Sequence, residues 1–196
     1  MKKTTFALLI LLSLSGPASA DKFDEAVTAY NKGNYTQALK LLRPLAAKGH
    51  AGAQFNLGWM HESGQGITQD YQEALKWYRL AAAKGHAGAQ FNLGWMYESG
   101  QGITQDYQEA LKWYRLAAGQ GNAVAPYNLG VMYGKGQGVI QDHVRAYMWF
   151  NLAAASGHGK AVKNRDIAAN NLTTAQIAEA QKLARECEKN KYQNCD

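Results

Sequence analysis

The sequence predicts an all-α fold, a right-handed α-solenoid of helix–turn–helix repeats that ends in a C-terminal capping helix pair. First, a 36-residue segment, KGHAGAQFNLGWMHESGQGITQDYQEALKWYRLAAA, begins at Lys48 and is repeated from Lys84 with only two changes. Second, each copy holds two stretches whose apolar residues recur at helical spacing. Third, a glycine follows each second stretch, at Gly49, Gly85, Gly121 and Gly157. A fixed period of this size is typical of solenoids, whose units bury apolar faces only against their neighbours.

The repeated text also resembles a known family. The run Ala51, Ala53, Leu57, Gly58, Gly64, Gly66, Asp70, Ala74, Trp77, Ala81, Ala82 and Gly85 is similar to the Sel-one-like repeat, a longer-looped relative of the tetratricopeptide repeat. The pattern recurs over residues 87–121 and, more loosely, over residues 123–157. The resemblance implies a scaffold or adaptor, in a family whose partners differ from member to member.

The first 20 residues have the three regions of a secretory signal peptide. Lys2 and Lys3 precede an apolar run from Phe6 to Leu14, and the small residues Ala18 and Ala20 lie where signal peptidase cuts. A retained anchor is disfavoured because a spanning helix needs about 20 apolar residues. We therefore expect a mature chain from Asp21, a periplasmic or secreted location, and no stable membrane insertion after cleavage.

Removal of residues 1–20 lowers the formal charge from +6 to +4, with 19 basic and 15 acidic residues remaining. A charge of this size serves solubility. Together with export, it argues against a nucleic-acid partner. We expect the mature protein to be a monomer.

The mature chain divides into five segments at the glycines that follow the repeats. Residues 21–49 predict a shorter tetratricopeptide-like unit. Residues 50–85, 86–121 and 122–157 predict three Sel-one-like repeats, each with helix A over about Ala51–Ser63 and helix B over about Asp70–Lys84, or their equivalents. The aspartates Asp70, Asp106 and Asp142 are predicted N-caps of the B helices. Residues 158–196 are the expected cap and tail.

The tail contains both cysteines, Cys187 and Cys195. An uninterrupted helix would hold them about 12 Å apart, whereas a disulfide needs α-carbons within about 7 Å. The helix that follows the predicted capping box of Thr173 and Gln176 must therefore end near Lys189 if the cysteines pair. Export favours the disulfide over two free thiols.

No catalytic residue, metal ligand set or cofactor motif is predicted. The histidines His50, His86 and His158 share one inter-repeat corner, where Asn122 takes the fourth place. Exchange with asparagine favours a capping or turn role. The paired glycines of the GQGITQD loops lack the preceding strand and following Lys-Ser/Thr of a phosphate loop. Cysteine-rich Helicobacter members of the family are described as acting on β-lactams, but no repeat of this chain contains a cysteine.

Helix A carries a second apolar stripe, opposite the one that packs into the stack. In tetratricopeptide-like superhelices helix A forms the inner wall, so these residues are predicted to line a concave groove, with neighbouring asparagines bonding an extended peptide. The alternative is that the aromatic residues pack onto helix B. The predicted partner-binding residues are Phe55, Trp59, Glu62, Phe91, Trp95, Glu98, Tyr127, Asn56, Asn92 and Asn128.

The sequence thus predicts an exported scaffold or adaptor that binds a protein or peptide in its groove and performs no chemistry. One alternative is a periplasmic inhibitor or immunity-type protein against a toxin or enzyme. The other, supported only by the resemblance, is an enzyme acting on cell-wall material or β-lactams.

Overall fold

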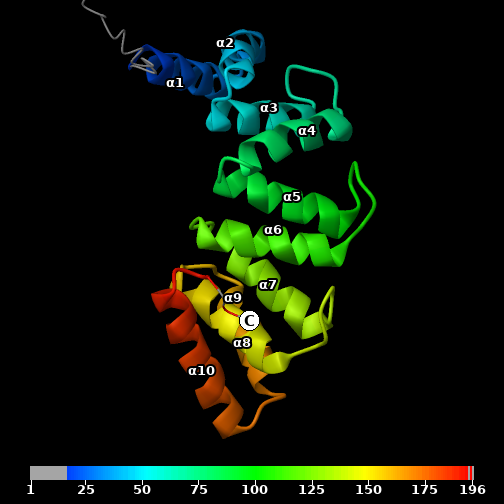
Figure 1. Cartoon of the computed structure of the whole chain (residues 1–196), viewed down its shortest axis with the longest axis vertical. Coiled ribbons are helices and arrows are strands. Elements are labelled where there is room, and N and C mark those ends of the chain that lie inside the picture. The colour runs from blue at the N-terminus through cyan, green and yellow to red at the C-terminus, as the bar shows by residue number, and fades with distance from the viewer. Residues whose placement is uncertain (1–16, 194, 196) are drawn as a thin grey trace, which may run out of the picture.

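The computed structural model describes residues 17–193 and 195, and these form ten α-helices without a strand. Most of the predicted signal peptide, residues 1–16, lies outside the described residues. The first eight helices follow one another down a single stack and the last two flank its lower end (Figure 1). The helical content of the described residues confirms the all-α prediction. They are α1 (Pro17–Asn31), α2 (Tyr35–Ala47), α3 (Ala51–Ser63), α4 (Tyr71–Ala82), α5 (Ala87–Ser99), α6 (Tyr107–Gly119), α7 (Ala125–Lys135), α8 (His143–Ala155), α9 (Ala161–Ala169) and α10 (Thr174–Lys189).

The helix boundaries follow from local capping. The side chains of Asp70, Asp106 and Asp142 accept backbone N–H bonds at the starts of α4, α6 and α8, as predicted. The Nδ1 atoms of His50 and His86 accept from backbone amides at 3.2 Å in the first turns of α3 and α5. Each bond satisfies an amide that the first turn leaves without a helical partner.

The remaining two corner residues, Asn122 and His158, differ from each other. Asn122 Oδ1 accepts from the amides of Val124 and Ala125 at 3.0 Å, which explains the exchange of histidine and asparagine. His158 instead lies in the turn before α9, and that helix has no side-chain cap. The predicted capping or turn role therefore fits all four corner residues: His50 and His86 cap α3 and α5, and Asn122 and His158 lie in the turns before α7 and α9.

The core lies between the two helices of each repeat and between successive repeats. Leu57 and Leu93 are 2% and 0% exposed. The next residues, Gly58 and Gly94, let helix A approach helix B closely. A Cβ at Gly58 would lie 2.6 Å from the Tyr78 ring, and one at Gly94 would lie 2.7 Å from the Tyr114 ring. The Leu-Gly pair of each repeat thus sets the distance between its two helices.

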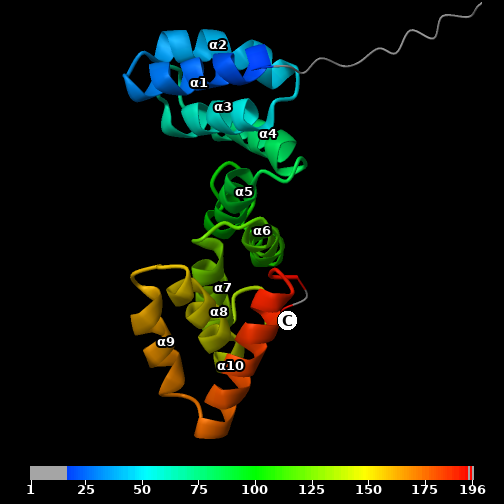
Figure 2. The same ribbon diagram turned by 90° about the vertical axis from the view of Figure 1, so that its left-hand side faces the viewer.

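Past the last repeat, α9 and α10 lie on opposite sides of α8 (Figure 2) and both pack against it. α10 contributes Ala180, Ala184 and Cys187 to the buried cluster that contains Leu152. At the equivalent position of the preceding B helices, Leu80 and Leu116 are 48% and 43% exposed. The C-terminal helices therefore join a core that the earlier repeats leave partly open.

The chain turns back after α10 through two left-handed residues, Lys191 at φ 52° and Tyr192 at φ 62°. Tyr192 stacks near Trp149, with ring centroids 6.5 Å apart. This reversal brings Cys195 to Cys187, and the two form a disulfide with α-carbons 4.9 Å apart. The predicted helix end at Lys189 is confirmed.

Candidate functional site

One surface of the stack, here called the A face, is formed by equivalent side chains of the A helices. Its first row consists of Phe23, Phe55, Phe91 and Tyr127, and its second row of Trp59, Trp95 and Val131. Three rings of the first row lie against corner histidines, Phe23 in a tilted arrangement and Phe55 and Tyr127 stacked. The centroid distances are 4.6 Å for Phe23 and His50, 4.5 Å for Phe55 and His86, and 4.1 Å for Tyr127 and His158. The rings are thus half-buried, and each links its helix to the next repeat.

The two predicted glutamates are engaged inside the protein. Tyr78 donates its hydroxyl proton to the Glu62 carboxylate, and Tyr114 donates to Glu98 at 2.6 Å. Burial raises the pKa of Glu62 and, together with the glutamate charge, raises that of Tyr78. A half-buried carboxylate with an internal donor gains less from a peptide than a free one would.

Two of the three predicted asparagines lie beside the same tyrosines. The amides of Asn92 and Asn128, each from the following repeat, oppose the rise in the pKa of Tyr78 and Tyr114. Asn56 has no such partner because Leu42 stands 36 residues before Tyr78. Among the predicted asparagines, Asn56 is thus the one without a B-helix tyrosine at the equivalent position, and it lines a pocket.

That pocket, the N-terminal pocket, has a volume of about 520 Å³ and lies between α1 and α3. Its wall includes Phe23, Val27, Tyr30, Phe55, Asn56, Trp59 and His86. Trp59 is 42% exposed, and its Nε1 donates to the Tyr30 hydroxyl at 2.7 Å. Tyr30 in turn donates to the Gln65 side chain. The indole is therefore held in place at a surface that remains open to solvent.

Sequence reasoning paired Trp95 with Trp59, but the structure places them differently. Trp95 is half-buried and packs against the clusters of two successive repeats. It does not line the N-terminal pocket. The local sequences are the same, so the difference comes from the neighbouring unit, which is the shorter α1–α2 pair for Trp59.

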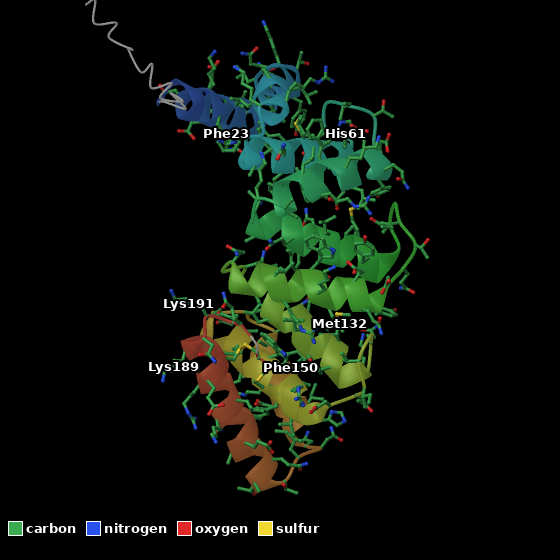
Figure 3. All side chains as sticks on the ribbon, viewed as in Figure 1. Phe23, His61, Met132, Phe150, Lys189 and Lys191 are labelled. Atoms are coloured by element: carbon green, nitrogen blue, oxygen red, sulfur yellow. A yellow bond between two sulfur atoms is a disulfide. The ribbon has the colours of Figure 1, made fainter. Side chains whose placement is uncertain are left out.

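A second cavity, the C-terminal pocket, lies between α7, α8 and α9 and has a volume of about 320 Å³. Tyr127 and Val131, which line it, occupy the repeat positions of Phe55 and Trp59. Both pockets therefore lie on the A face, near opposite ends of the stack. Figure 3 shows this separation in the labelled residues Phe23 and Phe150, which line one pocket each.

Sequence reasoning missed both the α1 side of the first pocket and the whole of the second. Phe23 and Tyr30 lie in the first unit, for which the sequence predicted only a tetratricopeptide-like helix pair. Lys135 and His143, which line the C-terminal pocket, replace serine and tyrosine of the earlier repeats. Lys135 and His143 could have been found from the sequence as departures from the repeat pattern.

Within the described residues, no group of three or more His, Cys, Asp or Glu side chains is arranged to hold a metal ion. No described helix is both long and apolar enough to cross a bilayer. A third cavity of about 520 Å³ lies where the tail meets α6, with Lys112, Arg115 and Tyr192 in its wall.

The chain was compared with protein families, curated proteins and solved structures. The Sel1 repeat model matches residues 30–50, 51–86, 87–122 and 123–158. No curated protein matches. A Sel1 repeat protein from Oxalobacter formigenes superposes with a TM-score of 0.73 at 33% identity, covering 88% of this chain and 74% of its own.

A protective antigen of uropathogenic Escherichia coli strains, which displays an SLR fold, gives a TM-score of 0.62 at 28% identity. The match covers 87% of this chain and 46% of the antigen, so this chain spans less than half of that protein. Four repeat matches cover well over half of the present chain. The chain therefore belongs to the Sel1 repeat family.

Proposed function

We propose that this protein is an exported scaffold or adaptor that binds a protein or peptide along its A face. The observation that carries the proposal is the N-terminal pocket, where Trp59 is exposed and Asn56 presents an amide beside it. Tryptophan and tyrosine are enriched among the side chains that dominate binding energy. The fold supports the same function, because solenoids present extended surfaces to their partners.

The size and lining of this pocket suit a segment of a peptide. Its wall is mostly apolar, and its volume of about 520 Å³ suits one or two side chains. The amide of Asn56 offers both a donor and an acceptor, as a peptide backbone requires. An extended segment can therefore place an apolar side chain against Trp59 and bond its backbone to Asn56.

Export is the second part of the proposal. It is supported by the signal-peptide features of residues 1–20 and by the Cys187–Cys195 disulfide, since disulfides persist in oxidising compartments. Mass analysis of the protein from the cell envelope should find Asp21 at the N-terminus. An intact Met1 on cytoplasmic protein would contradict it.

The binding proposal is tested by selecting peptides from a random display library on the chain from Asp21 to Asp196. Selected peptides are then titrated against wild type and two variants. Trp59→Ala should weaken them by about tenfold or more. Leu80→Ala is the matched control, because Leu80 is 48% exposed on a B helix and should leave the affinity unchanged. Equal affinities for wild type and Trp59→Ala would remove Trp59 from the site.

A further inference from the structure

The C-terminal pocket exists because the last repeat has smaller side chains than the earlier repeats at three positions. Val131 replaces the tryptophan of the A face, Gly134 replaces the glutamate and Phe150 replaces the tyrosine that bonds it. The hydroxyl and the carboxylate are lost together, so neither is left without its partner. What remains is a cavity of about 320 Å³ between α7, α8 and α9.

Two further exchanges bring basic side chains to the pocket. Lys135 stands in place of Ser63 and Ser99, and His143 in place of Tyr71 and Tyr107. No aspartate or glutamate is among the described residues that line the pocket. The two acidic residues nearest in sequence are engaged elsewhere, Asp142 with Arg145 at 2.6 Å and Asp166 with Arg165 at 2.9 Å. The pocket is therefore positive at a place where the other repeats carry a carboxylate.

The rim and the floor of the pocket have different chemistry. The exposed side chain of Lys135 has no ion pair within the described residues. The floor is apolar and includes the buried side chains of Ala146, Phe150 and Ala168, with Ile167 53% exposed at its edge. Burying a carboxylate against such a floor is costly, whereas a carboxylate at the rim keeps water and gains a cation. A ligand that fits must therefore present an apolar group inward and a negative charge outward.

We propose that the C-terminal pocket binds the C-terminal residue of a peptide partner. Its apolar side chain lies against Phe150 and its α-carboxylate lies at Lys135 and His143. The volume is at the low end of ligand sites, which run from about 300 to 1,000 Å³, so the pocket holds about one residue. Within one residue, only a chain terminus provides an apolar side chain and a carboxylate together. This inference rests on the proposed function, because the pocket lies on the same A face.

The test uses N-acetyl-phenylalanine and its C-terminal amide, titrated into ¹⁵N-labelled protein and followed by amide shifts. A fragment of this size should bind with a Kd of about 1 mM, and the amide should bind about tenfold more weakly. The shifts should cluster at Asn164 and Ile167, both of which line the pocket. Equal affinity of acid and amide, or no saturation of the acid by about 20 mM, would overturn the proposal.

Repeat-derived substitutions provide the controls. Lys135→Ser restores the residue of the earlier repeats and should lower the affinity for the acid to that for the amide. Val131→Trp restores the tryptophan and should abolish binding of both. Lys112→Ser, on α6, should change neither. An unchanged acid affinity in Lys135→Ser, or shifts confined to the N-terminal pocket, would refute the assignment.

The two proposals fail separately. The capped amino acid probes only the C-terminal pocket, whereas the library titrations with Trp59→Ala probe the N-terminal one. If library peptides depend on Trp59 and the acid probe does not bind, the scaffold function stands without the terminal pocket. If the probe binds as expected and no peptide depends on Trp59, the N-terminal pocket loses its role and the terminal pocket keeps its own.

Discussion

Tyr114 donates its hydroxyl proton to Glu98 at 2.6 Å, joining the second helix of a repeat to the first. The Asn128 amide of the next repeat opposes the rise in the pKa of the same hydroxyl. The Tyr114–Glu98 bond therefore ties the two helices of a repeat together, at a half-buried position where an unmet polar group is costly. In the last repeat, Phe150 and Gly134 remove both members of the pair.

Tyr114→Phe should therefore lower the free energy of unfolding by about 1 to 2 kcal/mol, because Glu98 loses its donor. Urea unfolding followed by circular dichroism measures this. Tyr107→Phe is the control, since within the described part of the chain the Tyr107 hydroxyl accepts only from the exposed Gln105 side chain. In the Glu98→Ala background, Tyr114→Phe should cost clearly less. Equal costs in both backgrounds would show that the pair is not coupled.

A second prediction comes from the main difference between the two copied repeats. Arg79 and Arg115 donate to the hydroxyls of Tyr97 and Tyr133, at 3.3 Å and 2.9 Å. The preceding repeat has Arg43 and His61 at these places, and His61 Nδ1 is buried without a hydrogen-bond partner among residues 17–193 and 195. His61→Tyr should raise stability by about 1 kcal/mol, or about 2 to 4 °C in Tm. Tyr97→His is the reciprocal control and should lower it; an unchanged Tm in both would contradict the argument.

The third prediction concerns pH. Burial lowers the pKa of His61 and of His86 below the ordinary value of 6.5. The unfolded chain then takes up these protons first, so stability is fully present above pH 6.5 and falls as the pH decreases below it. A variant with His61→Tyr and His86→Asn should lose less stability between about pH 7.5 and pH 5.5 than wild type. Asparagine is chosen because Asn122, at the equivalent position, accepts from the amides of Val124 and Ala125 at the start of α7.

The raised pKa of Glu62 acts in the opposite direction, since it adds stability as the pH falls through that value. Glu62 is present in both proteins, so the comparison isolates the histidines. Chemical unfolding at the two pH values provides the measurement. Parallel losses in wild type and variant would show that these rings do not control the acid sensitivity.

The repeat period made the helices predictable almost to the residue. Helix α3 begins at Ala51 and ends at Ser63, as expected, because His50 caps its start and Gly64 at φ 70° ends it. The C-terminal helix end at Lys189 followed from the reach of a disulfide. These features depend on local chemistry, which is the same wherever the same sequence recurs.

The candidate site depends on positions at which the repeats, or the units beside them, differ. Trp59 and Trp95 have the same flanking residues, yet only Trp59 meets the shorter first unit and Tyr30. The C-terminal pocket arises from the side chains missing at Val131 and Gly134. A cavity is the absence of neighbours, so it became visible only once the packing partners of each position were known.

The fourth prediction concerns the disulfide. Its loop of nine residues should contribute about 2 to 3 kcal/mol in the chain-entropy description. In a Cys187→Ser, Cys195→Ser variant, we expect the tail to detach from Trp149 and proteolysis to begin after Lys189 or Lys191. Hydrogen exchange should rise in α10 and remain unchanged in α3 to α6, because solenoid repeats are coupled only to their neighbours. Faster exchange throughout the stack would contradict a local role.

The last prediction separates the two tryptophans of the A face. Trp59 is 42% exposed, whereas Trp95 packs between two repeats, so their replacement should have different costs. Trp59→Ala should lower the free energy of unfolding by about 1 kcal/mol, the loss of its bond to Tyr30 included, and Trp95→Ala by about 2 to 3 kcal/mol.

Fluorescence tests the same difference without a partner. The emission lost in Trp59→Phe should be red-shifted and readily quenched by acrylamide, and that lost in Trp95→Phe should be bluer and better protected. Library peptides should lose affinity in Trp59→Ala and retain it in Trp95→Ala, because only Trp59 lines the N-terminal pocket. Equal quenching together with equal losses of stability would place both indoles in the core, and Trp59 would then no longer support a binding surface.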